Sequence, residues 1–263
     1  MDMWKYFGIT HREHVICNPT NEEKLDRLVA LLRLAPGAQV VDIACGKAEF
    51  LIRTAERYGA RCLGIDLSPF FIEEAGRSIR ARAPGAEVLL REMNGADFEP
   101  DEPHGFAMAS CLGGSWIYGG HGGTLDALIR LVAPGGWVIT GEPYWRQEPP
   151  PEYVEACGFG SEAFGTHAGN VEAGETRGLE LVHTLVSSQD DWDRYEGLQW
   201  YAASEYARSH PEDPDVPELL EKVAKERTAY LRWGRETLGW AIYLFRRPLV
   251  QRPAHAGQGA PKP

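Results

Sequence analysis

The stretch of sequence that decides the fold is residues 40–50, which reads VVDIACGKAEF. It begins with apolar residues around a single acid, Asp42, and continues with small residues that include Gly46. An apolar run of this kind is typical of a strand buried in a parallel sheet, and small residues permit a tight turn after it. Apolar residues then recur at roughly helical spacing over 48–58. We therefore expect a strand, a turn and a helix whose N-terminal amides face a crevice suited to a nucleoside-like ligand.

Strand and helix patterns alternate along the rest of the first half, and two more strand patterns follow later. The further strands are predicted at 61–65, 87–91, 105–110, 137–140, 179–187 and 240–245. Ala-Pro-Gly turns at 35–37, 83–85 and 133–135 each separate a helical pattern from the next strand. The alternation predicts an α/β fold: a Rossmann-like, seven-stranded, mostly parallel sheet with helices on both faces.

Several segments extend this central pattern. Residues 1–34 are expected to form an N-terminal cap segment and a helix, and residues 35–248 the main domain. The helical patterns between the last two strands are too long for a hairpin loop, so we expect an inserted helical cap. This substrate cap is predicted at about 147–178 and 189–237. Residues 249–263, dominated by Pro, Gly and Ala, are predicted to be a disordered tail.

Composition excludes several classes of protein. The net charge of -11 argues against nucleic-acid binding and favours small or cationic substrates. The sequence has neither a secretory signal pattern nor an apolar run long enough to span a membrane, so we expect a cytoplasmic protein that does not bind membranes. The five cysteines form no CxxC pair, and neither a metal site nor a disulfide framework is expected. The oligomeric state stays open.

Polar residues follow three of the predicted strands at their carboxyl ends, where open parallel sheets bind ligands. Asp42 follows the first strand and Asp66 the second, about 20 residues after the turn, where a carboxylate suits a ribose diol. Asn94, with Asp97 as the second choice, lies in the loop after the third strand and could meet an adenine edge. Each acid could instead cap a local turn. The three positions together favour a nucleoside site.

This arrangement resembles class I S-adenosylmethionine (SAM)-dependent methyltransferases over about residues 35–144. The segments 141–147 and 191–196 are similar to a group of uncharacterised, small-molecule-type bacterial methyltransferases, as is the N-terminal part from Phe7 to Pro19. The resemblance implies SAM as the cofactor. It implies that Asp42 organises the methionine end, that Asp66 holds the ribose, and that Asn94 reads the adenine amino group. The implied cofactor-binding residues are Asp42, Ala44, Gly46, Asp66, Leu67, Asn94, Gly95 and Cys111.

The chain departs from the family pattern in the turn and the adenine loop. Ala44 and Ala48 stand where the first and third glycines of the turn occur, and Asn94 stands where relatives often have Asp. Alanine is small enough to keep the backbone close to a ligand, and an amide oxygen can still accept a hydrogen bond from an amine.

The resemblance implies methyl transfer by in-line displacement to a nitrogen or oxygen of a small molecule. The expected catalytic residues are His14, Glu142 and Tyr144, and His11 is a further histidine that could serve as a base. The expected substrate-binding residues are Trp116, Trp145, Arg146, Trp192 and Tyr195. Each has a structural alternative: histidines at a helix entry, acids that cap turns, and aromatic residues of the core.

Two other functions remain open from the sequence. The altered glycines would also suit a protein that binds SAM without turnover, as a sensor or assembly protein. The spacing of Asp42 and Asp66 also occurs in nicotinamide-dependent oxidoreductases. The turn lacks the G-x-G-x-x-G pattern that cradles a pyrophosphate, which disfavours an NAD-dependent enzyme.

Overall fold

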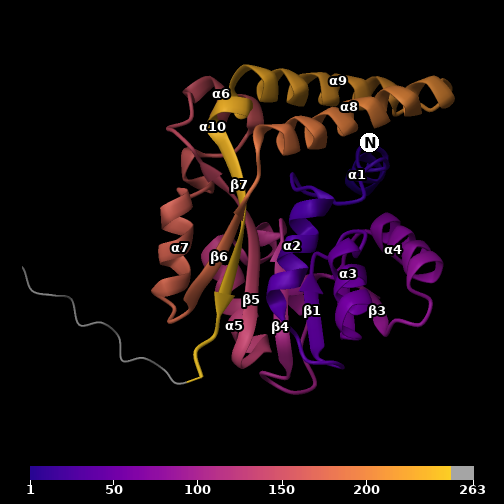
Figure 1. Cartoon of the computed structure of the whole chain (residues 1–263). Helices are drawn as coiled ribbons and strands as arrows, with labels where there is room; N and C mark the ends of the chain where they lie inside the picture. The colour runs from indigo at the N-terminus through magenta and orange to yellow at the C-terminus, as the bar shows by residue number, and fades with distance from the viewer. Residues whose placement is uncertain (250–263) are drawn as a thin grey trace, which may run out of the picture.

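A mixed sheet of seven strands forms the centre of the chain in the computed structural model, which describes residues 1–249 (Figure 1). The predicted disordered tail, apart from residue 249, lies outside the described residues. The strand order is β3-β2-β1-β4-β5-β7-β6, and β7 runs antiparallel to both of its neighbours. This confirms the predicted Rossmann-like, mostly parallel sheet. The strands are β1 (Gln39–Ile43), β2 (Arg61–Asp66), β3 (Val88–Glu92), β4 (Phe106–Leu112), β5 (Val132–Trp145), β6 (Glu180–Val186) and β7 (Leu238–Arg246).

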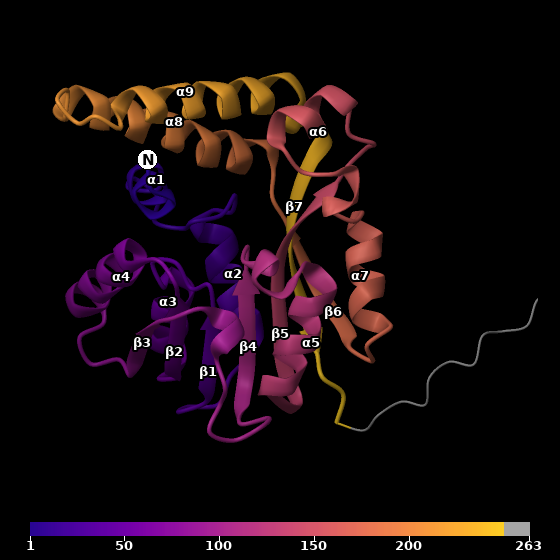
Figure 2. The ribbon, with the colours of Figure 1, turned by 180° about the vertical axis from the view of Figure 1, so that it is seen from behind.

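Helices cover both faces of the sheet, because successive strand residues point to opposite faces and both sets are apolar. In β1, Val40 packs into the core that lies under one set of helices, and Val41 and Ile43 pack into the core on the other side. Figures 1 and 2 show these two layers from opposite sides. One layer consists of α2 (Glu22–Leu32), α3 (Glu49–Tyr58) and α4 (Pro69–Arg82), and the other of α5 (His121–Leu131) and α7 (His167–Glu175).

Three helices lie above the carboxyl ends of the strands, and we call them the roof helices (Figure 1). They are α1 (Met3–Thr10), α8 (Gln189–Ser209) and α9 (Val216–Ala229); α8 and α9 are long and run side by side, and the short α1 lies beneath them. Tyr6 and Ile9 of α1 pack with Ala203 of α8 and Leu219 of α9 in a small core of their own. A π-helical turn at Tyr230–Gly234 and the short α10 (Arg235–Thr237) then lead into β7. Within residues 1–249, no helix is both long and apolar enough to cross a lipid bilayer.

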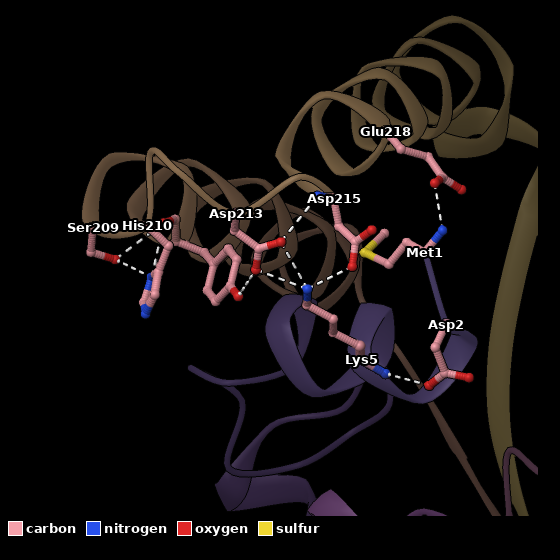
Figure 3. A network of polar contacts seen from close by, with 9 residues as sticks. Met1, Asp2, Lys5, Ser209, His210, Asp213, Asp215 and Glu218 are labelled. Atoms are coloured by element: carbon pink, nitrogen blue, oxygen red, sulfur yellow. Dashed lines mark hydrogen bonds and ion pairs between the residues drawn. The ribbon is translucent and has the colours of Figure 1, made fainter.

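Ion pairs join the N-terminal segment and the first helix to the loop between α8 and α9 and to the first turn of α9 (Figure 3). Lys5 Nζ lies 2.8 Å from Asp213 and 2.6 Å from Asp215, and the amino group of Met1 lies 2.5 Å from Glu218. Because these groups are near the surface, each pair stabilises the fold modestly. They fix the position of α1 against α8 and α9.

The structure differs from the sequence-based expectation along β5. The strand was predicted at 137–140, but it extends from Val132 to Trp145 and includes the Pro-Gly turn expected at 133–135. The irregular pairing register between Phe106 and Met108 absorbs that turn. At the other end, β7 pairs with β5 as far as Trp145, which prolongs the strand beyond the sheet's other carboxyl ends.

Segment 147–178 also differs from the expected cap. It contains α6 (Pro151–Cys157), a short turn at Ser161–Ala163, and α7. Helix α7 packs closely on the sheet: a Cβ added to Gly174 would lie 2.4 Å from the ring of Phe245 in β7. This helix is therefore part of the layer that covers the sheet, and the cavity described below is covered by other segments.

Candidate functional site

A cavity of about 210 Å³ lies where the strands β1, β2 and β4 end. Its lower side is formed by the loops that follow these strands and β3, and its upper side by α1, residues 15–18 and one residue of α8. Nine of the residues expected to bind cofactor or substrate line it: Asp42, Ala44, Gly46, Asp66, Leu67, Asn94, Gly95, Trp116 and Tyr195. The structure therefore brings together residues from all four predicted strand ends.

Asp42, at the end of β1, presents a buried carboxyl group to this cavity. Its Oδ1 accepts a hydrogen bond of 2.6 Å from Ser110 Oγ of β4. Burial, together with the nearby charge of Asp66, raises the pKa of Asp42 to about 7, and the hydrogen bond from Ser110 opposes the shift. Among the described residues, Oδ2 has no hydrogen-bond partner. The site thus favours a ligand that brings a positive charge or hydrogen-bond donors to Asp42.

The turn after β1 follows the glycine-type backbone path although two of its residues are alanines. Ala44 and Ala48 have φ angles of 57° and 58°, and Gly46 has 54°. This left-handed conformation is strained for alanine and free of strain for glycine. The neighbouring loop is also tight, since a Cβ added to Gly114 would lie 2.5 Å from the Ala44 Cβ. Small residues are needed here because the backbones approach closely.

Asp66 fixes the position of this turn from the end of β2. Its Oδ2 accepts a hydrogen bond of 2.8 Å from the Gly46 amide, and its Oδ1 accepts one of 2.8 Å from the Ser68 amide. Burial raises the pKa of Asp66, and the backbone hydrogen bonds oppose the shift. Each carboxylate oxygen can accept a second hydrogen bond, so Asp66 can hold the turn and still bind a ligand hydroxyl.

The loop after β3 supplies Asn94 and Gly95. Asn94 Oδ1 accepts a hydrogen bond of 3.1 Å from the Ala96 amide, which leaves the side-chain NH₂ and one oxygen lone pair available. A Cβ added to Gly95 would lie 2.4 Å from Ile43, so this glycine permits the loop to pack against β1. Asp97, the second choice for the adenine edge, is exposed and does not line the cavity.

Lys47 connects the turn to the upper side of the cavity, and sequence reasoning missed it. Its buried Nζ donates hydrogen bonds to the carbonyl oxygens of His11 at 2.8 Å and Arg12 at 3.0 Å. The same Nζ lies 2.5 Å from Glu74 of α4. A lysine inside an otherwise small and apolar turn was the only sequence signal for this role.

Two neighbouring histidines contact Tyr195 of α8. His11 Nε2 lies 2.9 Å from the Tyr195 hydroxyl, and His14 Nε2 lies 2.8 Å from the Tyr195 carbonyl oxygen. Burial lowers the pKa of His11 to about 3 and that of His14 to about 4. His11 lines the cavity and His14 does not. The structure thus places the histidine that sequence analysis ranked second at the site.

The other two expected catalytic residues lie on β5 outside the cavity lining. Glu142 is buried, its Oε1 accepts a hydrogen bond of 3.0 Å from Ser115 Oγ, and its Oε2 has no partner within residues 1–249. Burial raises the pKa of Glu142 to about 7. Tyr144 packs against His167 of α7, with ring centroids 4.9 Å apart. The extended β5 carries both side chains away from the strand ends.

Several other expected site residues also lie apart from the cavity. Trp145 Nε1 donates to the Ser161 carbonyl at 2.7 Å, and its ring packs with Tyr153 and Phe164. Arg146 is exposed and reaches Gln189 at 3.3 Å. Trp192 stacks on Tyr230 in a separate aromatic cluster, and Cys111 is buried in the core below Gly114. By contrast, Trp116 lines the cavity with 65% of its surface exposed.

Comparison with known proteins defines the class of this chain. Residues 40–136 match a family model described as a methyltransferase domain. The uncharacterized protein YjhP of Escherichia coli K12 is 33% identical, over 92% of this chain and 98% of that protein. A SAM-dependent methyltransferase from Geobacter sulfurreducens, solved in complex with S-adenosyl-L-homocysteine, has a TM-score of 0.85 and 32% identity, covering 92% of this chain and 98% of that one.

A second solved complex agrees with the first. The SAM-dependent methyltransferase from Thiobacillus denitrificans, also with S-adenosyl-L-homocysteine, has a TM-score of 0.86 and 34% identity, covering 94% of this chain and 100% of that one. The chain therefore belongs to the SAM-dependent methyltransferases. Within this class, it is similar along nearly its whole length to YjhP and to the two proteins crystallised with the demethylated cofactor. The cofactor is SAM, which sets aside the nicotinamide alternative.

The residues of the cavity fit this cofactor. SAM carries a positive sulfonium, a positive ammonium group and a ribose diol. Asp42 lines the cavity and uses one carboxylate oxygen for Ser110, and Asp66 offers free lone pairs one strand away. The absence of side chains at Gly95 and Gly114 keeps the surrounding backbone close to the strand ends. Asp42, Gly46, Asp66 and Asn94 are the residues that would hold it.

Proposed function

We propose that this chain transfers the methyl group of SAM to a nitrogen or oxygen atom of a small molecule. The observation that carries the proposal is the enclosure of the cavity. Trp4 and Phe7 of α1 and Tyr195 of α8 line its upper side, opposite Asp42 and Gly46. A space of about 210 Å³ under these side chains supports a small acceptor over a folded macromolecule.

When bound, SAM supplies an electrophilic methyl group on a sulfonium. The side chains of the turn and of Asp66 hold the reactants in a fixed orientation, which is the main requirement of an in-line displacement. The roof helices exclude water, which strengthens electrostatic contacts inside the site. Neither His14, Glu142 nor Tyr144 lines the cavity, so the proposal assigns proton removal to none of them. A neutral amine attacks through its lone pair and can lose its proton after transfer.

The proposal can be tested with methyl-labelled SAM and fractionated cell extracts. We expect repeated transfer of label into products that pass a small-molecule filter and that carry the methyl group on nitrogen or oxygen. Label found only in protein or nucleic acid would contradict the proposal. Tight binding of the cofactor with no labelled product across all fractions would favour the sensor function instead. Asp42→Asn provides a cofactor-site control, which should lose the transfer.

A further inference from the structure

His11 and Tyr195 form a hydrogen-bonded pair inside the cavity although they lie 184 residues apart. His11 Nε2 and the Tyr195 hydroxyl are 2.9 Å apart, and the two rings meet edge to face. Both residues line the cavity on the side opposite the residues expected to hold SAM. This pair therefore lies on the side of the cavity where the roof helices could contact a methyl acceptor.

The hydrogen-bond partners of the pair determine which atom carries each hydrogen. Thr10 Oγ1 donates its hydrogen to the Tyr6 carbonyl at 3.0 Å, because a carbonyl oxygen can only accept. At its contact of 3.1 Å with His11 Nδ1, Thr10 Oγ1 is therefore the acceptor, and Nδ1 carries the proton. Since burial keeps His11 neutral, its Nε2 has no hydrogen and accepts the one from Tyr195. The Tyr195 oxygen then has only lone pairs left for a ligand.

His14 has the opposite tautomer and binds the backbone of Tyr195, whereas His11 binds its hydroxyl group. Its Nε2 lies 2.8 Å from the Tyr195 carbonyl oxygen, so Nε2 must carry the hydrogen. Its Nδ1 is buried without a partner among the described residues. The two histidines thus fix both the backbone and the hydroxyl group of Tyr195.

The charged side chains around the cavity disfavour anionic acceptors. Lys47 is the one lysine or arginine among the described residues that line it. Its Nζ is already bound to two carbonyl oxygens and to Glu74. The remaining upper surface consists largely of apolar and aromatic side chains such as Trp4, Phe7 and Phe71. A carboxylate placed against these side chains would be buried without a free cationic side chain beside it, which is costly.

We propose that Tyr195 selects the methyl acceptor through a hydrogen bond that it can only accept. The acceptor class is then an uncharged small molecule with an apolar or aromatic body that presents an O–H or N–H group. This inference rests on the proposed function, since it describes the acceptor of that same site. It makes Tyr195 an acceptor-binding residue and His11 a positioning residue.

The first test observes the tautomers directly. Long-range ¹H–¹⁵N NMR correlation of the histidine rings in the full chain, with His11→Gln to assign the signals, distinguishes the two neutral forms. We expect the proton on Nδ1 in His11 and on Nε2 in His14. A His11 ring protonated at Nε2 would leave the Tyr195 hydroxyl free to donate, and would overturn the inference.

The second test uses small probes in place of the unidentified acceptor. Binding of phenol, anisole and benzoate to the chain saturated with S-adenosyl-L-homocysteine is measured by ligand-observed NMR. We expect phenol to bind about threefold to tenfold more tightly than anisole, which corresponds to one hydrogen bond, and benzoate to bind more weakly than either. Tyr195→Phe should remove the preference for phenol. Tyr201→Phe, the same change at a site of α8 that is 56% exposed, should retain it.

The outcomes separate this inference from the proposed function. Equal or absent binding of phenol and anisole, or tighter binding of benzoate, would overturn the inference even if labelled methyl groups reach small molecules. Labelled methyl groups found only on macromolecules would contradict the proposed function and with it the small-molecule acceptor, whereas the expected tautomers and probe binding would still support an accepting hydrogen bond at Tyr195.

Discussion

At the scale of single residues, the turn that binds the cofactor holds two alanines in a conformation that glycine adopts freely. Ala44 is partly exposed, whereas Ala48 is buried in the core. Replacing Ala44 by glycine therefore removes strain with little loss of packing. The left-handed conformation costs alanine roughly 1–2 kcal/mol, and the greater chain entropy of glycine offsets roughly 0.5–1 kcal/mol of the gain.

We expect Ala44→Gly to raise the free energy of unfolding by up to about 1 kcal/mol in urea titrations. Ala86→Gly is the matched control, because Ala86 is also partly exposed but has an ordinary negative φ. That control should lower the free energy of unfolding. Equal losses in both variants would show that the turn is unstrained at Ala44.

Replacement of Asp66 should change the affinity of the site for the cofactor. It holds two backbone amides of the site and has lone pairs left for a ligand. We expect Asp66→Ala to weaken binding of S-adenosyl-L-homocysteine by about 1–3 kcal/mol in calorimetry, because buried polar groups lose their partner. Asp97→Ala, at an exposed acid of the neighbouring loop, should leave the affinity unchanged. An unchanged affinity in Asp66→Ala would remove this residue from the cofactor site.

At the scale of secondary-structure elements, helix α8 carries a partly buried acid, Glu196, close to a second acid on α9. Burial raises the pKa of Glu196 to about 8, and the charge of Glu226 on α9 adds to the shift. The ionised side chain therefore destabilises the packing of the roof helices most at pH values above 8. As the pH falls toward the unfolded value of about 4.5, the folded state binds a proton and the destabilisation disappears.

We expect Glu196→Gln to raise the free energy of unfolding on the order of 1 kcal/mol at pH 8.5 and by much less at pH 5.5. Glu221→Gln, at an exposed position of α9, is the control and should change little at either pH. Denaturant titrations at the two pH values measure both. A gain that does not depend on pH would rule out the buried charge as its cause.

The elements also show what the sequence could and could not predict. The strand ends that bear Asp42, Asp66 and Asn94 were predictable because each follows an apolar run and precedes small or turn-forming residues. The length of β5 was not, since its extension depends on pairing with β7 about 100 positions later, which no local pattern encodes. That extension displaced Glu142, Tyr144 and Trp145 from the expected site. The role of His11 likewise depends on Tyr195, a contact between distant segments.

At the scale of the whole molecule, two sets of buried groups give stability opposite dependences on pH. Among the carboxyl groups with raised pKa values, three reach about 7 to 8, and the stability that they contribute at low pH is lost as the pH rises through that range. Among the histidines with lowered pKa values, three reach about 3 to 4, and the stability that they contribute is lost as the pH falls below about 6.5, where the unfolded chain binds protons. The carboxyl groups are those of Asp42, Glu142 and Glu196, and the histidines are His11, His14 and His121.

Between pH 8.5 and 6.5 the histidines are mostly neutral in both states, and the carboxyl groups determine the slope. We expect the urea midpoint of the cofactor-free chain to rise as the pH is lowered over this range, and to level off below it where the histidines oppose the trend. The midpoint measured at intervals of half a pH unit provides the test. A midpoint that falls from pH 8.5 to 6.5 would be incompatible with the buried carboxyl groups.

The positions of the roof helices in the sequence determine when the site becomes enclosed during synthesis of the chain. Lys5 of α1 and its partner Asp213 are 208 residues apart, and β7 follows only after α9. On the ribosome, the first helix emerges early and can contact α4, but its partners α8 and α9 are made only after residue 188. A nascent chain that already contains Asp42, Asp66 and Asn94 thus has an open crevice in place of a closed site. The enclosure that separates acceptor from water is completed only once α8 has been synthesised and packs against α1.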